Sequence, residues 1–245
     1  MAQNRVVYDL REAVAASNAA HPPTCPICRL VRAATKGYLE SLLYEMVNDV
    51  PMREAIRQAR GFCNTHAWQM QGLGRALGVS IIHHDVLGAA IAALRQASYQ
   101  PAGSLSWGRL WEGLDRHRPA QATQGLVTGL EPKRDCPACT YRAEMQDVYL
   151  TALLEQLGDG DLAPELAASA GLCLPHLRRG LQLVRDEETF RRLVAWALAG
   201  LESLRDELAE FIRKSDYRFS EDGFGEEGDA WLRAIARVAG EEGGS

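Results

Sequence analysis

The sequence has little of what marks a β-sheet protein, a membrane protein or a secreted protein. Alternating runs of β-branched residues, which indicate strands, are scarce. The longest apolar runs, LGAAIAAL (87–94) and LVAWALAGL (193–201), are far shorter than the ~20 residues that cross a bilayer. The N-terminal segment MAQNRVVYDLREAVAAS is polar and mixed, without the apolar core of a secretory signal. We therefore expect an all-α protein of the cytoplasm with no membrane partner.

A strong charge of either sign is also absent. The 245 residues include 27 Lys and Arg against 32 Asp and Glu, a net charge of -5. This balance provides no general attraction to nucleic acid or acidic lipid. Small basic clusters such as Arg116-His117-Arg118 lack the interleaved aromatic residues of a nucleic-acid interface. The sequence therefore favours a protein partner over nucleic acid, although a local basic patch leaves the second role open.

The sequence has no signature of the common enzyme classes. It contains no Gly-rich phosphate loop, no HExxH motif and no nucleophile elbow. The segment His83-His84-Asp85 offers acid–base or metal-binding groups, but nothing matches it elsewhere in the chain, so we interpret it as a solvated helix face. The sequence favours a binding or structural protein over an enzyme, and we predict no catalytic residues.

The chain has only six cysteines, and all of them lie in matched motifs. CPIC (25–28) is followed by GFCNTH (61–66), and CPAC (136–139) is followed by GLCLPH (171–176). Each set has three cysteines and one histidine: Cys25, Cys28, Cys63 and His66 in the first, and Cys136, Cys139, Cys173 and His176 in the second. In a reducing compartment, such cysteines are metal ligands or redox centres more often than disulfides.

These motifs belong to an internal duplication. A shift of 111 residues aligns the two CPxC motifs and places YLESLL (38–43) on YLTALL (149–154), and a shift of 110 aligns Gly61, Cys63 and His66 with their counterparts. We expect four segments: a first zinc-binding helical repeat at 1–98, a linker at 99–134 with a short helix near 107–114, a second zinc-binding repeat at 135–214, and an acidic loop with a C-terminal helix at 215–245.

Apolar residues at helical spacing define the predicted elements. In the first repeat we expect a helix from CPIC to about residue 46, a short helix that Gly61 ends, a third at about 64–77 and a fourth at 79–98. A long amphipathic helix is expected at 187–214. The tryptophans are interpreted as anchors of the core or of the repeat interface: Trp68, Trp107, Trp111, Trp196 and Trp231.

Three sulfurs and one imidazole form a closed tetrahedral set, Cys3His, which suits Zn2+. We expect two zinc ions per chain, each held within one repeat. The first helix leads away from CPIC by ~30 Å, and the segment up to GFCNTH is just long enough to return. An exchange of half-sites between the repeats is the alternative pairing. Because the protein fills all four positions, no position is left for water, and we expect the zinc to be structural.

Other interpretations of the motifs stay open. An iron–sulfur cluster with three cysteines and one histidine is the chief alternative centre. CPxC also suits thiol chemistry, so oxidation that releases zinc would make the protein a redox sensor. Attachment of haem is disfavoured because Arg29 and Thr140, rather than histidines, follow the two CxxC motifs. Packed cysteines and histidines without metal are disfavoured because eight such residues recur in register.

Together the motifs are similar to those of a known family. CPIC, YLESLLYEMVND, GFCNTH, CPAC and GLCLPH, with the C-terminal RKSDYRFSEDGFGEEGDAWLRAIARVAG, resemble an uncharacterised bacterial domain-of-unknown-function family with paired CPxC and GFCxxH motifs. The resemblance covers nearly the whole chain except 99–134. It implies a bacterial protein with structured repeats and implies no activity. We therefore predict a scaffold or interaction module stabilised by two zinc sites, with a redox sensor, an iron–sulfur protein or a nucleic-acid-binding module as alternatives.

Overall fold

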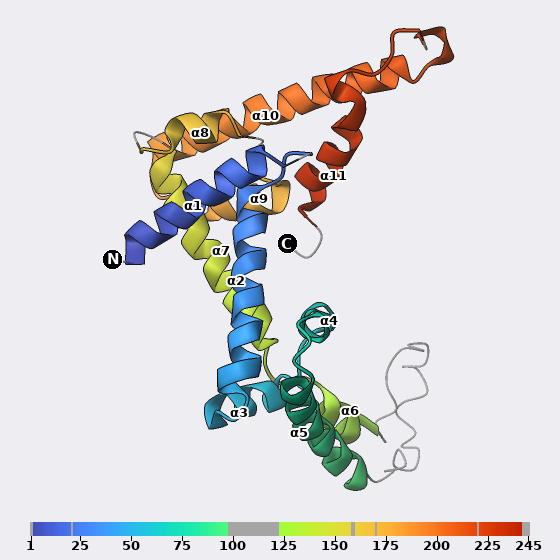
Figure 1. Ribbon diagram of the computed structural model, residues 1–245. Coiled ribbons are helices and arrows are strands. Elements are labelled where there is room, and N and C mark those ends of the chain that lie inside the picture. The colour runs from blue at the N-terminus through green and yellow to red at the C-terminus, as the bar shows by residue number, and fades with distance from the viewer. Residues whose placement is uncertain are drawn as a thin grey trace, which may run out of the picture. The chain divides into compact units, whose positions relative to one another are not determined.

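The structure is a computed structural model that describes residues 2–20, 22–97, 123–157, 160–169, 171–219 and 221–241. Within these ranges every regular element is helical (Figure 1), which confirms the predicted all-α fold. The chain divides into two compact units, which we call unit 1 (residues 1–37 and 141–245) and unit 2 (residues 38–140).

Unit 1 is built around one hydrophobic core. Its helices are α1 (Ala2–Asn18), the first part of α2 (Pro26–Ser41), most of α7 (Pro137–Gln156), α8 (Ala163–Ala167), α9 (Leu174–Leu183), α10 (Glu187–Lys214) and α11 (Ala230–Ala239). The core includes these fully buried side chains: Leu10, Val14, Ile27, Val31, Leu150, Leu153, Leu162, Leu166 and Leu193. The start of α2 therefore shares a core with the later part of α7.

Unit 2 has a core of its own. It contains the end of α2, a π-helical turn (Leu42–Met46), α3 (Val50–Gln58), α4 (Asn64–Gly72), α5 (Ala76–Arg95), α6 (Gln124–Leu130) and the start of α7. Its buried residues are Leu39, Leu42, Leu43, Val47, Ile56, Met70, Ile82 and Ala138. In this unit the end of α2 shares a core with the start of α7, the reverse of the arrangement in unit 1.

The two units do not coincide with the two sequence repeats. Residues 1–37 of the first repeat pack with the second repeat, and the predicted linker contains α6, whose residues lie in unit 2. Helices α2 and α7 are counterparts in the duplication, and each contributes to both units. The short helix predicted near 107–114, together with Trp107 and Trp111, lies outside the described residues.

Local sequence signals account for several helix boundaries. Asp186 caps α10 by accepting a hydrogen bond from the Thr189 amide at 2.8 Å, and the predicted 187–214 helix is confirmed. Asp49 caps α3 in the same way, with Met52 as donor at 2.8 Å. The predicted third and fourth helices are α4 and α5, which end at Gly72 and Arg95, earlier than expected. Helices α1, α6 and α8 were not predicted; α6 and α8 are short, and α1 lies in an N-terminal segment of mixed polar and apolar residues.

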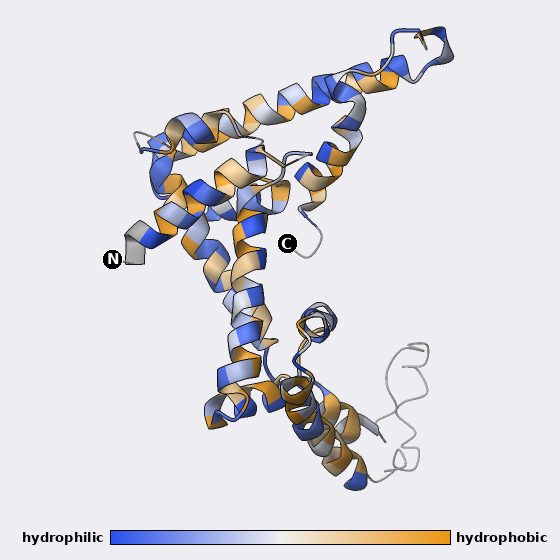
Figure 2. Ribbon diagram, in the orientation of Figure 1, coloured by the Kyte–Doolittle hydropathy of each residue, from blue (hydrophilic) through white to orange (hydrophobic). Residues whose placement is uncertain are grey.

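Helix α5 is the most apolar long helix and is little buried. It is the one described helix whose length and composition would allow it to span a bilayer, although the longest uninterrupted apolar run within it is short. Orange ribbon, the colour of hydrophobic residues, marks much of α5 in Figure 2. Its exposed apolar side chains are Leu77, Leu87, Ile91 and Leu94. Length and composition alone also fit a soluble helix, so this feature assigns no compartment.

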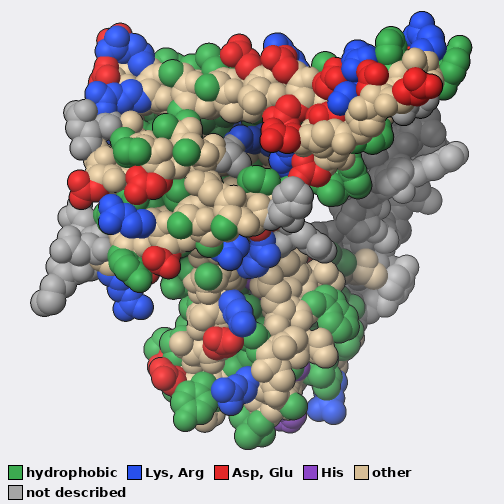
Figure 3. Space-filling model, turned by 45° about the horizontal axis from the view of Figure 1, so that its top comes forward, with side chains coloured by type: hydrophobic (Ala, Val, Ile, Leu, Met, Phe, Trp, Pro, Cys, Tyr) green, Lys and Arg blue, Asp and Glu red, His purple; other side chains and the backbone are tan. Residues whose placement is uncertain are grey.

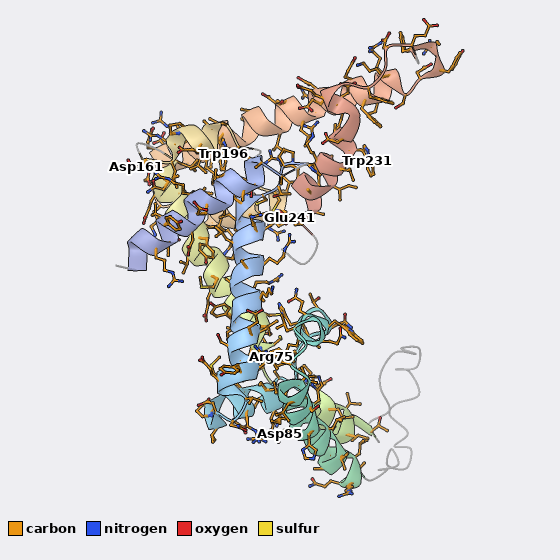
Figure 4. The ribbon with its side chains drawn as sticks, viewed as in Figure 1. Arg75, Asp85, Asp161, Trp196, Trp231 and Glu241 are labelled. Carbon is orange, nitrogen blue, oxygen red and sulfur yellow. The ribbon has the colours of Figure 1, made fainter. Side chains whose placement is uncertain are left out.

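Figure 4 labels two of the tryptophans, Trp196 and Trp231, and Asp85 of the His-His-Asp segment. Trp196 packs against the core of unit 1 and donates to the carbonyl of Leu166 at 2.8 Å. Trp68 and Trp231 are 67% and 48% exposed, so their interpretation as core anchors is wrong. Asp85 is not a free solvated acid, since it accepts from Arg57 at 3.0 Å on the neighbouring helix α3.

Candidate metal centres

The structure gathers all eight predicted residues into two groups. Cluster 1, in unit 1, consists of Cys25, Cys28, Cys173 and His176. Cluster 2, in unit 2, consists of Cys63, His66, Cys136 and Cys139. Within each cluster the four donor atoms lie within 4.8 Å of one another, and none of the six cysteines forms a disulfide. Each cluster therefore presents three sulfurs and one imidazole nitrogen to a common point.

The predicted pairing of the motifs within each repeat is wrong. Cluster 1 joins the CPxC of the first repeat to the CxxH of the second, and cluster 2 joins the remaining half-sites. The cause is the way in which α2 and α7 share the two cores. Since the start of each of these helices shares a core with the end of the other, each CPxC lies beside the segment that follows the opposite helix. The alternative of exchanged half-sites is the one the structure has.

Each half-site is formed by the start of a helix. Cys25 directly precedes α2, and its carbonyl accepts from the Arg29 amide, while Cys28 lies one turn further on. Cys173 is the N-cap of α9, with extended backbone, and His176 lies in the first turn. The same geometry recurs in cluster 2, where Cys63 caps α4. Free amides and the helix dipole at these N-termini favour thiolates, so four helix starts supply the donors of two clusters.

In cluster 1 the nitrogen that faces the sulfurs is Nδ1 of His176. It lies 3.1 Å from Sγ of Cys173, 3.4 Å from Sγ of Cys28 and 3.6 Å from Sγ of Cys25. The sulfurs of Cys28 and Cys173 are 3.7 Å apart. These spacings are too long for covalent bonds and form the edges of one small polyhedron.

Cluster 2 repeats this geometry closely. Nδ1 of His66 lies 3.2 Å from Sγ of Cys63, 3.4 Å from that of Cys139 and 3.6 Å from that of Cys136. The sulfurs of Cys63 and Cys139 are 3.6 Å apart. Around an ion at ~2.3 Å from sulfur and ~2.0 Å from nitrogen, a regular tetrahedron has edges of roughly 3.8 Å between sulfurs and roughly 3.5 Å from sulfur to nitrogen. The sulfur–sulfur separations of 3.7 Å and 3.6 Å and the sulfur–nitrogen separations of 3.1 to 3.6 Å are close to these edges.

In cluster 1 the ionisation of Cys25 is favoured by its neighbours, and it opposes the ionisation of Cys28 and Cys173. Burial opposes the ionisation of Cys25, but hydrogen bonds from Cys173, Cys28 and His176 hold its pKa well below the ordinary value. The side chain of Cys25 in turn raises the pKa of Cys173 to about 12, and both neighbours raise the pKa of Cys28 far above its usual range. A cation among the sulfurs favours the thiolate form of all three cysteines.

In cluster 2, burial raises the pKa of Cys139 to about 12, with further contributions from Cys63 and Cys136. A divalent metal entering either cluster has to displace protons from these thiols. The residues present fit a metal that favours thiolate and imidazole, because each donor set is complete and its atoms are already at coordination spacing.

The two clusters differ in exposure. In cluster 1 the exposed fractions are 4% for Cys25, 0% for Cys28 and 1% for both Cys173 and His176. In cluster 2 His66 is buried, at 3%, but all three cysteines are partly exposed. Cluster 1 is thus part of the core of unit 1, while the sulfurs of cluster 2 border on solvent.

Comparison with known proteins agrees with the motifs. A protein from Caldicellulosiruptor sp. (strain Rt8B.4), described as an uncharacterized 23.9 kDa protein in the xynA 3' region, is 25% identical over 218 residues, which are 88% of this chain and 95% of that protein. No solved structure matches the chain. A model of the family of unknown function DUF6062 matches residues 6–243. The resemblance read from the cysteine motifs is thereby confirmed, and the chain belongs to this family.

Proposed function

We propose that this protein is a zinc-binding helical scaffold of a reducing compartment, with one structural Cys3His zinc site in each unit. The observation that carries the proposal is the agreement of both clusters with the edges of a tetrahedral site for a single ion. Such agreement, in two places and from eight separately positioned residues, is what a pair of closed zinc sites requires.

A structural role is supported by what each cluster joins. Cluster 1 ties the start of α2 to the start of α9, and cluster 2 ties the start of α4 to the start of α7. In both cases the tied helices come from distant parts of the sequence. Binding of the metal therefore closes long loops, and its binding energy contributes directly to folding. With four protein ligands no coordination position is left for water or substrate, which favours a scaffold over an enzyme.

The sulfur spacings favour one ion over an iron–sulfur cluster in each site. An iron–sulfur cluster distributes its four protein ligands over two or more iron atoms, so ligands on different irons lie farther apart than the edge of one tetrahedron. In each cluster the histidine Nδ1 lies within 3.6 Å of all three sulfurs, which is the spacing of four ligands on a single ion.

Elemental analysis combined with an absorption spectrum tests this proposal. Protein purified without oxygen and protein purified in air should both contain two zinc ions per chain and be colourless. Iron with visible absorption, or a metal content near zero in both preparations, would contradict it.

A redox-sensing role is the second candidate, and the exposure of cluster 2 favours it. The partly exposed sulfurs of Cys63 and Cys139 are 3.6 Å apart, close enough to join after the metal leaves. Hydrogen peroxide would oxidise the two thiolates to one disulfide and, with two protons from the solvent, would itself be reduced to two molecules of water. The zinc ion would be released because two of its ligands are lost.

Treatment with peroxide followed by a zinc-release assay separates the two roles. A sensor should lose one zinc ion per chain at peroxide concentrations that leave cluster 1 intact, and thiol reductant should restore binding. Equal resistance of both sites would leave the scaffold as the function. The Cys139→Ser variant is the control, since it removes the site expected to respond.

A further inference from the structure

Arg237 of α11 contacts the backbone directly beside cluster 1. Its Nη1 donates a hydrogen bond of 2.7 Å to the carbonyl oxygen of Leu172, the residue directly before the ligand Cys173. The two partners are 65 positions apart in the sequence, so this contact depends on the docking of α11 in unit 1. The guanidinium therefore fixes the segment that presents Cys173 and His176.

Gly171 provides the space for this contact. Its φ of +81° lies in the left-handed region, and a Cβ there would lie 2.6 Å from Nη1 of Arg237. The equivalent Gly61 beside cluster 2 also has positive φ, at +97°, but a Cβ there would meet only Val86, at 3.7 Å. The duplicated glycines thus share a backbone conformation, and only one of them adjoins a cation.

The charge of Arg237 complements a metal-loaded cluster 1. Three thiolates, one neutral imidazole and a divalent ion carry a net charge of minus one, which is costly to bury without compensation. Arg237 is largely shielded from solvent: burial lowers its pKa, while the charges of Cys25 and Cys173 act in the opposite direction. An arginine in such a place remains a cation. It is therefore placed to offset the charge of the site.

A cavity of about 270 Å³ in unit 1 reaches this region. Its lining includes Cys25, Cys173 and Arg237, together with Thr24 and Glu207. Figure 3 shows basic side chains in the hollow beneath α10. The cavity therefore borders cluster 1 at Cys25 and Cys173, and Arg237 lies in the same lining.

We propose that Arg237 is a positioning residue that retains the metal of cluster 1. This inference rests on the proposed zinc function. It holds the Leu172 carbonyl, and with it the Cys173–His176 half-site, and it offsets the net charge of the loaded site. Cluster 2 is arranged differently, with Val86 beside the corresponding glycine. The proposal predicts that substitution of Arg237 weakens the more buried of the two sites.

The test is the rate at which a chromophoric chelator takes zinc from cluster 1. The Cys139→Ser protein serves as background, because it leaves cluster 1 as the one complete donor set. Arg237→Met, which keeps much of the side-chain volume, should release zinc about ten-fold faster or more, the range found when partners of metal ligands are removed. Arg237→Lys, which keeps the charge but loses the planar fork, should give an intermediate rate.

Two controls separate retention of the metal from loosening of α11. Arg233→Met removes the ion pairs of Arg233 with Glu207 and Asp229, which also hold α11, without touching the Leu172 carbonyl. Gly171→Ala should displace Arg237 and accelerate release from cluster 1, while Gly61→Ala in the otherwise native chain should leave cluster 1 unchanged.

The outcomes are distinct. Faster release in Arg237→Met and Gly171→Ala, with partial rescue in Arg237→Lys and little change in Arg233→Met, supports the proposal. Equal acceleration in Arg233→Met, or an unchanged rate in Arg237→Met, overturns it while leaving the zinc function intact. Absence of zinc from the unsubstituted protein would overturn the proposed function itself.

Discussion

Clusters 1 and 2 have the same four kinds of donor and nearly the same spacings, yet they differ in their surroundings. In cluster 1 every donor residue is at most 4% exposed and three of the four belong to the core of unit 1. In cluster 2 the three cysteines are partly exposed. The duplication has thus preserved the donors and their helix starts, whereas burial is set by the helices packed around them. We expect the two sites to differ in stability and accessibility more than in chemistry.

The largest expected effect is on the folding of unit 1, in which the variants Cys28→Ser and Cys139→Ser should differ. Cys28 is fully buried in the core of unit 1, so its substitution should remove one zinc and unfold much of unit 1. Cys139 is partly exposed, and its substitution should also remove one zinc but leave unit 1 folded. Metal analysis with circular dichroism measures both effects. Full helicity in Cys28→Ser would show that cluster 1 does not support the fold.

Acidification should release metal from both sites, and from cluster 2 first. The metal-free clusters hold protons at neutral pH, since the pKa values of Cys139 and Cys173 are raised to about 12. Loading therefore expels protons, and a fall in pH favours the metal-free state. Exposure gives acid and chelator easier access to cluster 2. A titration with a zinc indicator should show two steps, with the first absent in Cys139→Ser. A single step in both proteins would contradict the difference in exposure.

A substitution that creates a cavity in one core should destabilise that unit and leave the other unit unchanged. Leu150 in unit 1 and Leu42 in unit 2 are both fully buried. Leu150→Ala and Leu42→Ala should each cost about 2–5 kcal/mol, because each removes packed methyl groups. Hydrogen exchange should locate each loss in its own unit. Leu77→Ala is the control, since Leu77 is 76% exposed and its substitution should have little effect. Loss of protection throughout both units in either variant would show that they do not unfold independently.

Removal of the helix caps should give the smallest difference in stability between the two units. Asp49 in unit 2 and Asp186 in unit 1 each accept a backbone hydrogen bond of 2.8 Å at the start of a helix. Asp49→Ala and Asp186→Ala should each cost about 1 kcal/mol. Asp186 also accepts from the hydroxyl of Thr189, so its substitution should cost somewhat more. Thermal melting of the zinc-loaded protein measures both. A clearly larger loss for Asp49→Ala would contradict this ranking.

Much of the site is predictable from the sequence. In CPxC and CxxH the two ligands are three positions apart, so both can reach the same ion from one helical turn. All eight residues of the two clusters were identified from CPxC and CxxH alone. Their pairing was not, since chain length permits ligation both within and between repeats. The two cores that α2 and α7 share decide between these pairings, and such a core brings together residues far apart in the chain, such as Ile27 and Leu150.

The fold shows a similar division between local and long-range information. The limits of α10 follow from the cap at Asp186 and from apolar residues at helical spacing. Helix α1 was not predicted, although Val6, Leu10 and Val14 recur at helical spacing and Leu10 and Val14 are fully buried. The role of Arg237 could not be predicted from the sequence either, because an arginine on an amphipathic helix is ordinarily a surface residue. Its role becomes visible only when α11 is docked beside Gly171.

The central claim is that two metal ions are held by half-sites from different repeats. Substitution with 113Cd followed by proton–cadmium correlation NMR tests it directly, because each ion correlates only with its own ligands. We predict two cadmium signals, one coupled to Cys25, Cys28, Cys173 and His176 and the other to Cys63, His66, Cys136 and Cys139. A signal that couples Cys25 and Cys28 to Cys63, or the absence of bound cadmium, would contradict the account.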